Sequence, residues 1–204
     1  MIELLACKLG RNDEVPNIEL AEKLCGSMDK DGVLEIADGL KSIDTAVVND
    51  CIKVLYEVGY IEPALISGFA DDFIDALSSK NNRLVWGSMT ALACIAPVRS
   101  EAIFDRLPEI ISAYENGSVI TIDNSISVFA GLCKVGEKYN TVVFPVLIEH
   151  LKKCRAKEIP QHAERMAVCI GPENKDPFIE ALRAREGELT DSQKTRLAKL
   201  IKKL

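Results

Sequence analysis

The chain has 204 residues, of which 48% are hydrophobic and 27% charged, and its formal net charge is −6. This length suits one domain that buries enough apolar surface to fold without disulfides or metals, and the composition is too apolar for disorder. The N-terminal residues lack the pattern of a secretory signal, and the longest uncharged run, 84–98, is shorter than the roughly 18–20 residues of a membrane-spanning helix. We therefore expect a cytoplasmic protein with no membrane partner.

The charge is unevenly distributed along the chain. Residues 1–100 contain 9 Lys and Arg against 16 Asp and Glu, a net charge of −7, whereas residues 101–204 are close to balance. A nucleic-acid-binding protein needs a cationic surface that displaces counterions from phosphates. Basic residues cluster only locally, at 152–157 and 194–203, so we do not expect nucleic acid as the partner.

Two columns of apolar residues recur along the chain with a spacing of about 37 residues, the range of helical repeat units. The first column comprises Leu55, Leu92, Phe129 and Ala167, and the second comprises Ile36, Ile74, Ile111 and Ile148. Because two independent columns share one period, the sequence predicts a stack of similar structural units.

Each unit is predicted to contain two helices, since its apolar residues recur at i, i+3 and i+4. An opening pair with a weaker pattern is expected at 2–9 and 17–25. The first helices of the later units are expected at 32–41, 63–78, 100–116, 142–154 and 177–185, and the second helices at 44–59, 81–96, 119–136, 159–171 and 191–204. Asp44 and Asp191 suit the N-caps of their helices. The strand-like stretch 118–122 lies in helical context and is assigned to a helix.

The apolar ladder of the second helices and the proline-containing first helices, such as 107–111 and 144–148, resemble those of HEAT and armadillo repeat proteins. The resemblance implies an all-α superhelix of five to six antiparallel helix pairs. It implies a single domain over 1–204, with an N-terminal cap at 1–28, core repeats at 29–171 and a C-terminal cap at 172–204. It is silent on activity.

The second helices also carry a polar stripe on the face opposite their apolar ladder. In the folds that the chain resembles, second helices usually line the concave surface where an extended partner binds. The sequence therefore predicts a binding site for a protein or peptide, with Trp86, the only tryptophan, as an anchor. The predicted binding residues are Asn49, Asp50, Lys53, Arg83, Trp86, Asp123, Asn124, Gln161, His162 and Arg165. The alternative is a solvated face without a ligand, with Trp86 lying flat over neighbouring helices.

No catalytic or phosphate-binding motif is present in the sequence. The seven cysteines form no CxxC pair, and the two histidines, His150 and His162, fall in different helices without a zinc-type spacing. We therefore expect no cofactor, no metal and no enzymatic activity, and predict a protein-interaction or scaffold module. Two alternatives stay open: a HEAT-like DNA-binding protein of the alkylation-repair type, and a HEAT-like lyase or regulatory subunit that acts on a bound cofactor.

Overall fold

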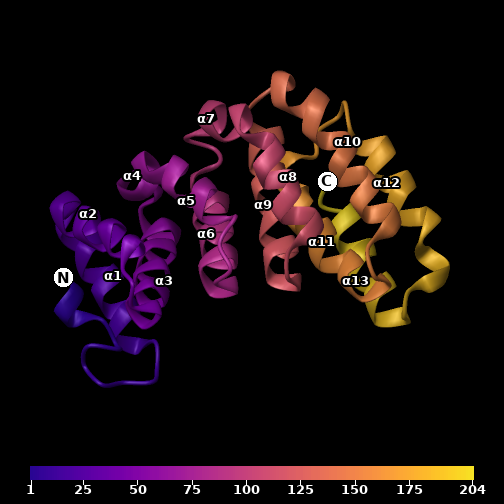
Figure 1. The fold of residues 1–204 in the computed structure, drawn as a ribbon. Helices are drawn as coiled ribbons and strands as arrows, with labels where there is room; N and C mark the ends of the chain where they lie inside the picture. The colour runs from indigo at the N-terminus through magenta and orange to yellow at the C-terminus, as the bar shows by residue number, and fades with distance from the viewer. The chain divides into compact units, whose positions relative to one another are not determined.

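The computed structural model describes residues 1–204, and its regular elements are α-helices and short 3-10 helices, with no strand (Figure 1). No helix combines the length and the apolar character that crossing a membrane requires. The chain divides into two compact units, Met1–Ser125 and Ile126–Leu204, and the boundary falls inside one helix. The prediction of one continuous repeat domain stays a prediction.

The first unit consists of short and long helices that alternate along the chain. They are η1 (Ile2–Leu4), α1 (Val15–Ser27), α2 (Lys30–Asp38), η2 (Gly39–Lys41), α3 (Thr45–Ile61), α4 (Pro63–Ile66), η3 (Ser67–Phe69), α5 (Ala70–Ala76), α6 (Asn82–Ile95), α7 (Ser100–Asp105), α8 (Leu107–Asn116) and the start of α9 (Val119–Val135). Helix α3 packs against α1, α2, α4 and α6, and α6 also packs against α5. The predicted second helices of the first units are thereby confirmed as α3 and α6, placed side by side.

The second unit contains the rest of α9 and the helices that follow it. They are α10 (Glu137–Lys153), η4 (Ala156–Glu158), α11 (Ile159–Met166), η5 (Ala167–Cys169), α12 (Lys175–Ala184), η6 (Glu186–Glu188) and α13 (Asp191–Ile201). Helix α10 packs against α11 and α12, and α11 packs against α13. First helices therefore contact first helices and second helices contact second helices, as expected of stacked helix pairs.

Three of the four residues of the first predicted apolar column lie in the core, while the fourth, Ala167 in the 3-10 turn η5, is half-buried. Leu55, Leu92 and Phe129 are fully buried, and each such side chain contributes about 1.5–3 kcal/mol by leaving water. Small side chains occur where neighbouring helices approach closely. A Cβ atom at Gly87 of α6 would lie 2.7 Å from Cγ1 of Ile52 in α3, so this crossing requires glycine. The predicted small column Cys51, Ser88, Ser125 and Ala163 is also fully buried.

Several predicted boundaries are wrong for local reasons. The expected helix at 2–9 is only the 3-10 turn η1 followed by turns. The first helix expected at 100–116 is divided into α7 and α8, because Pro108 occupies the first turn of α8 and disfavours helical backbone before it. Thr190, not Asp191, is the N-cap of α13, where it forms a reciprocal capping box with Gln193. Asp44 caps α3 as predicted, by accepting a hydrogen bond from the amide of Ala46.

Candidate functional site

The polar stripe of the first unit lies on two adjacent helices. Residues at i, i+3 and i+4 of α3 and α6 share one face, which we call the α3–α6 face. It comprises Asn49, Asp50, Lys53, Tyr56, Glu57 and Tyr60 of α3 and Arg83, Trp86 and Thr90 of α6. The packing of α3 on α6 brings these residues together as the sequence predicted, although the tyrosines were not part of that prediction.

Three aromatic rings form a ladder across the α3–α6 face. The centroids of Tyr56 and Trp86 are 5.8 Å apart with tilted planes, and those of Tyr56 and Tyr60 are 5.9 Å apart in an edge-to-face arrangement. Such pairs lie in the favourable range for aromatic contacts. Tyr56 is buried, Trp86 is half-buried, and Tyr60 is 62% exposed. The buried ring of Tyr56 therefore lies in the middle of the ladder, with half-buried Trp86 at one end and exposed Tyr60 at the other.

Two cations lie against these rings and are held there by one carboxylate. Lys53 Nζ is 4.8 Å from the Tyr56 centroid, and the Arg83 guanidinium is 5.9 Å from the Trp86 centroid. Glu14, the residue before α1, forms ion pairs with both: its Oε2 is 3.0 Å from Lys53 Nζ, and its Oε1 accepts a hydrogen bond from Arg83. Lys53 is additionally paired with Glu57 at 2.5 Å.

The protonation of this cluster follows from these contacts. Burial alone would lower the pKa of Lys53, but its hydrogen bonds to Glu57 and Glu14 outweigh burial and raise that pKa. Burial would raise the pKa of Glu14, but Lys53 and Arg83 outweigh it and hold the pKa below its ordinary value. At neutral pH the lysine is cationic and the glutamate anionic.

Several polar residues of the predicted stripe have partners within the chain. Asn49 Oδ1 accepts a hydrogen bond of 2.8 Å from Asn81 Nδ2, and Asp50 Oδ2 accepts one of 2.8 Å from the amide of Cys7. Lys53 is itself buried. The partner of Asp50, Cys7, comes from the segment before α1, outside the repeat period, and sequence reasoning missed it for that reason. The partner of Asn49, Asn81, is the N-cap of α6, the neighbouring helix of the stripe.

The next predicted residues extend the first unit's stripe to the start of α9. Asn124 Nδ2 donates a hydrogen bond of 2.7 Å to Oγ1 of Thr90 in α6, and both Asp123 and Asn124 are half-buried. Helix α6 therefore contacts polar-stripe residues of two neighbouring helices. Its Trp86 contacts Tyr56 of α3, and its Thr90 contacts Asn124 of α9.

The remaining predicted residues, Gln161, His162 and Arg165, belong to the second unit. Gln161 and Arg165 are half-buried, and Arg165 donates a hydrogen bond of 2.6 Å to Ser127 Oγ. His162 is fully buried, so its predicted place on an exposed face is wrong. The apolar residues around it explain this: Ile159, Ala163 and Met166 of the same short helix are fully buried, and His162 faces inward with them.

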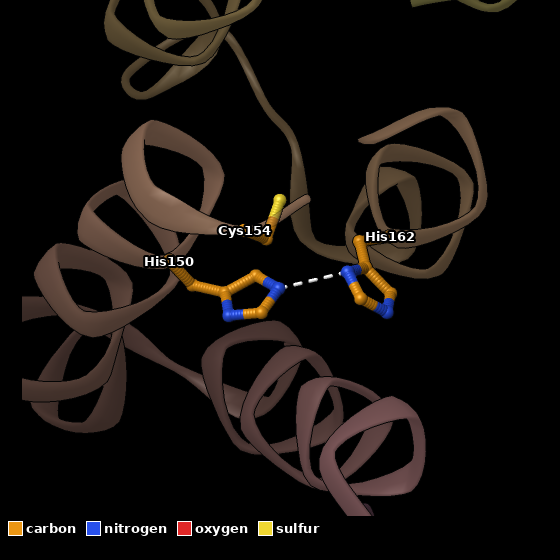
Figure 2. A group of neighbouring side chains, drawn as sticks. All are labelled: His150, Cys154 and His162. Carbon is orange, nitrogen blue, oxygen red and sulfur yellow. Dashed lines mark hydrogen bonds between the residues drawn. The ribbon is translucent and has the colours of Figure 1, made fainter. Parts of the chain in front are cut away.

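A second cluster of polar side chains lies inside the second unit (Figure 2). His150 is on the last turn of α10, Cys154 follows that helix directly, and His162 is on α11. His150 Nε2 and His162 Nδ1 are 2.8 Å apart in a hydrogen bond, and one ligand atom of each of the three residues lies within 4.8 Å of the others. The two histidines do fall in different helices, as the sequence predicted, but the turn η4 brings them together.

The thiol of Cys154 is the most accessible group of this cluster. It is half-buried, while both histidines are buried. Burial raises the pKa of the Cys154 thiol to about 11, against the opposing effect of the Arg185 guanidinium. The i, i+4 spacing of His150 and Cys154 places them on one helix face and was the sequence signal that could have indicated this cluster.

Comparison with protein-family models and with curated protein sequences gives no match. Solved structures do match over nearly the whole chain. A crystal structure of an engineered protein from the Northeast Structural Genomics Consortium has a TM-score of 0.69 and 16% identity, covering 98% of this chain and 95% of its own. A designed armadillo repeat protein in complex with the peptide (KR)4 has a TM-score of 0.69 and 11% identity, covering 93% of this chain and 90% of its own. A crystal structure of computationally designed armadillo repeat proteins for modular peptide recognition has a TM-score of 0.64 and 11% identity, covering 92% of this chain and 91% of its own.

These matches define the class of the protein. The chain has an all-α, armadillo-like helical repeat fold, which confirms the resemblance inferred from its repeat period. At 11–16% identity the matches establish the fold alone.

Proposed function

We propose that the protein is a non-enzymatic binding module that holds an extended peptide segment on the α3–α6 face. The observation that carries the proposal is the aromatic ladder, in which half-buried Trp86 packs on buried Tyr56 and leads to exposed Tyr60. Rigid aromatic side chains at the edge of a packed helix pair are the usual anchors of protein interfaces. One of the structurally similar designed proteins is in complex with a peptide, and others were designed for modular peptide recognition. These two similarities support peptide binding here.

The charges favour a peptide that carries lysine or arginine. Residues 1–100 have a net charge of −7, and the two cations of the α3–α6 face are already paired with Glu14 and Glu57. Lysine and arginine side chains bind the faces of Trp and Tyr rings, with about 0.5–2 kcal/mol per contact. An acidic chain also accelerates the approach of a basic partner. The same pairing of Lys53 and Arg83 argues against a nucleic acid at this face, because phosphates would compete with Glu14 for both cations.

Because Trp86 is the only tryptophan, its fluorescence reports on this face directly. The test is a titration with a Lys/Arg peptide such as (KR)4, followed by Trp86 emission, with an acidic peptide of equal length for comparison. We expect saturable binding of the basic peptide, at least about tenfold tighter than that of the acidic one, and weakened by salt.

The matched variants are Tyr60→Ala, which removes the exposed end of the ladder, and Tyr139→Ala in α10 of the second unit. Tyr60→Ala should weaken basic-peptide binding several-fold while Tyr139→Ala leaves it unchanged. Equal affinity for both peptides, or equal affinity of both variants, contradicts the proposal. A duplex DNA that binds more tightly than either peptide, with steep salt dependence, would favour the DNA-binding alternative instead.

A further inference from the structure

We propose that His150, Cys154 and His162 form a binding site for a transition-metal ion of the zinc type, independent of the α3–α6 face. The inference rests on the convergence of two imidazoles and one thiol from two helices inside the second unit, with one ligand atom of each within 4.8 Å of the others (Figure 2). Nothing in the peptide-binding proposal uses these residues.

The chemistry of the donors selects the ion. Zinc and similar divalent ions take imidazole nitrogen and thiolate sulfur as ligands, whereas calcium and magnesium take oxygen. The cluster contains two nitrogen donors and one sulfur donor and no carboxylate. A site with three protein ligands leaves a fourth tetrahedral position for water or another small ligand.

The distances are close to those of a loaded site. With metal–nitrogen bonds of about 2.0–2.1 Å, two nitrogens of a tetrahedral zinc site lie about 3.3 Å apart. The nitrogens of His150 and His162 are 2.8 Å apart, so they need to separate by only about half an ångström. The ligand atoms span at most 4.8 Å, and contraction to about 3.6 Å between nitrogen and sulfur is within reach of small side-chain rotations.

The backbone around Cys154 is fixed by groups that are not themselves ligands. The amide of Cys154 donates a hydrogen bond of 2.8 Å to the carbonyl of His150, which closes the last turn of α10. Arg185 donates hydrogen bonds of 2.8 Å and 2.9 Å to the carbonyls of Leu151 and Cys154. This guanidinium caps the C-terminal end of α10 and fixes the backbone that carries Cys154. The supporting contacts resemble the outer-shell interactions that orient metal ligands.

Accessibility also fits a site that exchanges its ion with solvent. Both imidazoles are at least nine-tenths buried, with His162 fully buried and His150 6% exposed, while Cys154 is half-buried. Burying two imidazoles is unfavourable unless their nitrogens have partners. The His150–His162 hydrogen bond supplies one partner for each ring in the absence of metal, and an ion would replace that hydrogen bond with two coordinate bonds.

The test uses the full-length chain, reduced and stripped of metal with a chelator, and titrated with Co²⁺ and then with Zn²⁺. We expect one equivalent of Co²⁺ to bind with a thiolate-to-cobalt charge-transfer absorption, and Zn²⁺ to displace it stoichiometrically. Cys154→Ser should abolish the charge-transfer absorption. His162→Gln should weaken Zn²⁺ affinity by at least about 100-fold, since even the loss of an outer-shell partner costs 10–100-fold.

Cys7→Ser is the matched control, because Cys7 is also half-buried but lies in the first unit, outside the cluster. It should bind both ions like the unaltered protein.

Circular dichroism of the metal-free variants separates lost ligands from lost folding. If the cluster variants fail to fold, X-ray absorption of the unaltered zinc form replaces them, with one sulfur and two imidazoles expected around the ion. Absence of stoichiometric binding, unchanged absorption in Cys154→Ser, loss of binding in Cys7→Ser, or a shell of oxygens alone would overturn the proposal. In each of those cases the histidine pair is a structural hydrogen bond only.

Discussion

Glu14 and Arg83 form an ion pair across 69 positions of the chain, and the same glutamate also holds Lys53. The segment before α1 is thereby tied to both α3 and α6, directly beside the aromatic ladder. Because of these ion pairs, Lys53 and Arg83 of the predicted stripe belong to a charge network within the first unit. It explains why the α3–α6 face presents rings, not unpaired cations, to a partner.

The first prediction concerns this network and its dependence on pH. The pKa of Glu14 is lowered in the folded protein, so its contribution to stability is present above its unfolded pKa of about 4.3 and is lost as the pH falls through the folded value. The Glu14 side chain is 43% exposed, so solvent screening limits the effect. We expect Glu14→Gln to lower the free energy of unfolding by about 1 kcal/mol at pH 7, and by much less at pH 3. Urea unfolding of both proteins at the two pH values measures this. A difference that persists undiminished at pH 3 would show that the carboxylate charge is not the cause.

The second prediction tests the repeat register. Leu92 of α6 is fully buried, so Leu92→Ala should cost about 2–5 kcal/mol through lost burial and the cavity that remains. Val98→Ala is the control, because Val98 is 56% exposed and should change stability by less than about 0.5 kcal/mol. Both values come from chemical denaturation. A loss below 0.5 kcal/mol at Leu92 would contradict its place in the core.

The third prediction distinguishes a binding anchor from a core residue. Trp86 is half-buried against Tyr56, and so Trp86→Ala should reduce stability by less than Leu92→Ala does. The same variant should weaken binding of a basic peptide by about 2 kcal/mol, the loss typical of an interface hot spot. Calorimetric titration measures the binding without relying on tryptophan emission. A stability loss of about 3–5 kcal/mol without a specific loss of affinity would instead identify Trp86 as a buried aromatic that covers the neighbouring helices.

The fourth prediction concerns the cysteines. Cys51, Cys133 and Cys169 are buried, and burial raises the pKa of the Cys51 thiol to about 12. Because burial keeps the reagent away from the sulfur atoms, a thiol reagent should modify these three residues at least about tenfold more slowly in the native protein than in urea. Mass spectrometry of peptides at several time points resolves each site. Rapid native labelling of Cys51 would mean that α3 opens locally or that its packing face is assigned wrongly.

Much of the helix order could be predicted from the sequence, because the periodic burial of Leu55, Leu92 and Phe129 follows directly from helical geometry. The functional surfaces could be predicted only in part. Trp86 and Arg83 were found because they belong to the repeat, whereas Glu14 acts from outside it and Tyr60 was hidden in an apolar run. The His150–His162 contact depends on the path of a short 3-10 turn between two helices, and turn geometry is not encoded in helical periodicity.

The last prediction tests the close approach of α3 and α6, which positions the ladder. A methyl group at Gly87 would lie 2.7 Å from Ile52 Cγ1, too close without displacement of the helices. Gly87→Ala combines a gain of about 1 kcal/mol in helix propensity with an overpacking cost of about 1–3 kcal/mol, so we expect a net loss of stability. In an Ile52→Ala background the clash is absent, and Gly87→Ala should become stabilising by up to about 1 kcal/mol. Gly26→Ala in α1 is the matched control, since nothing lies within 4 Å of the added atom, and it should stabilise the protein in both backgrounds. Chemical denaturation of the unaltered protein, Gly87→Ala, Ile52→Ala and the double variant gives a double-mutant cycle. If Gly87→Ala changes the free energy of unfolding with the same sign in both backgrounds, Gly87 and Ile52 are not in contact.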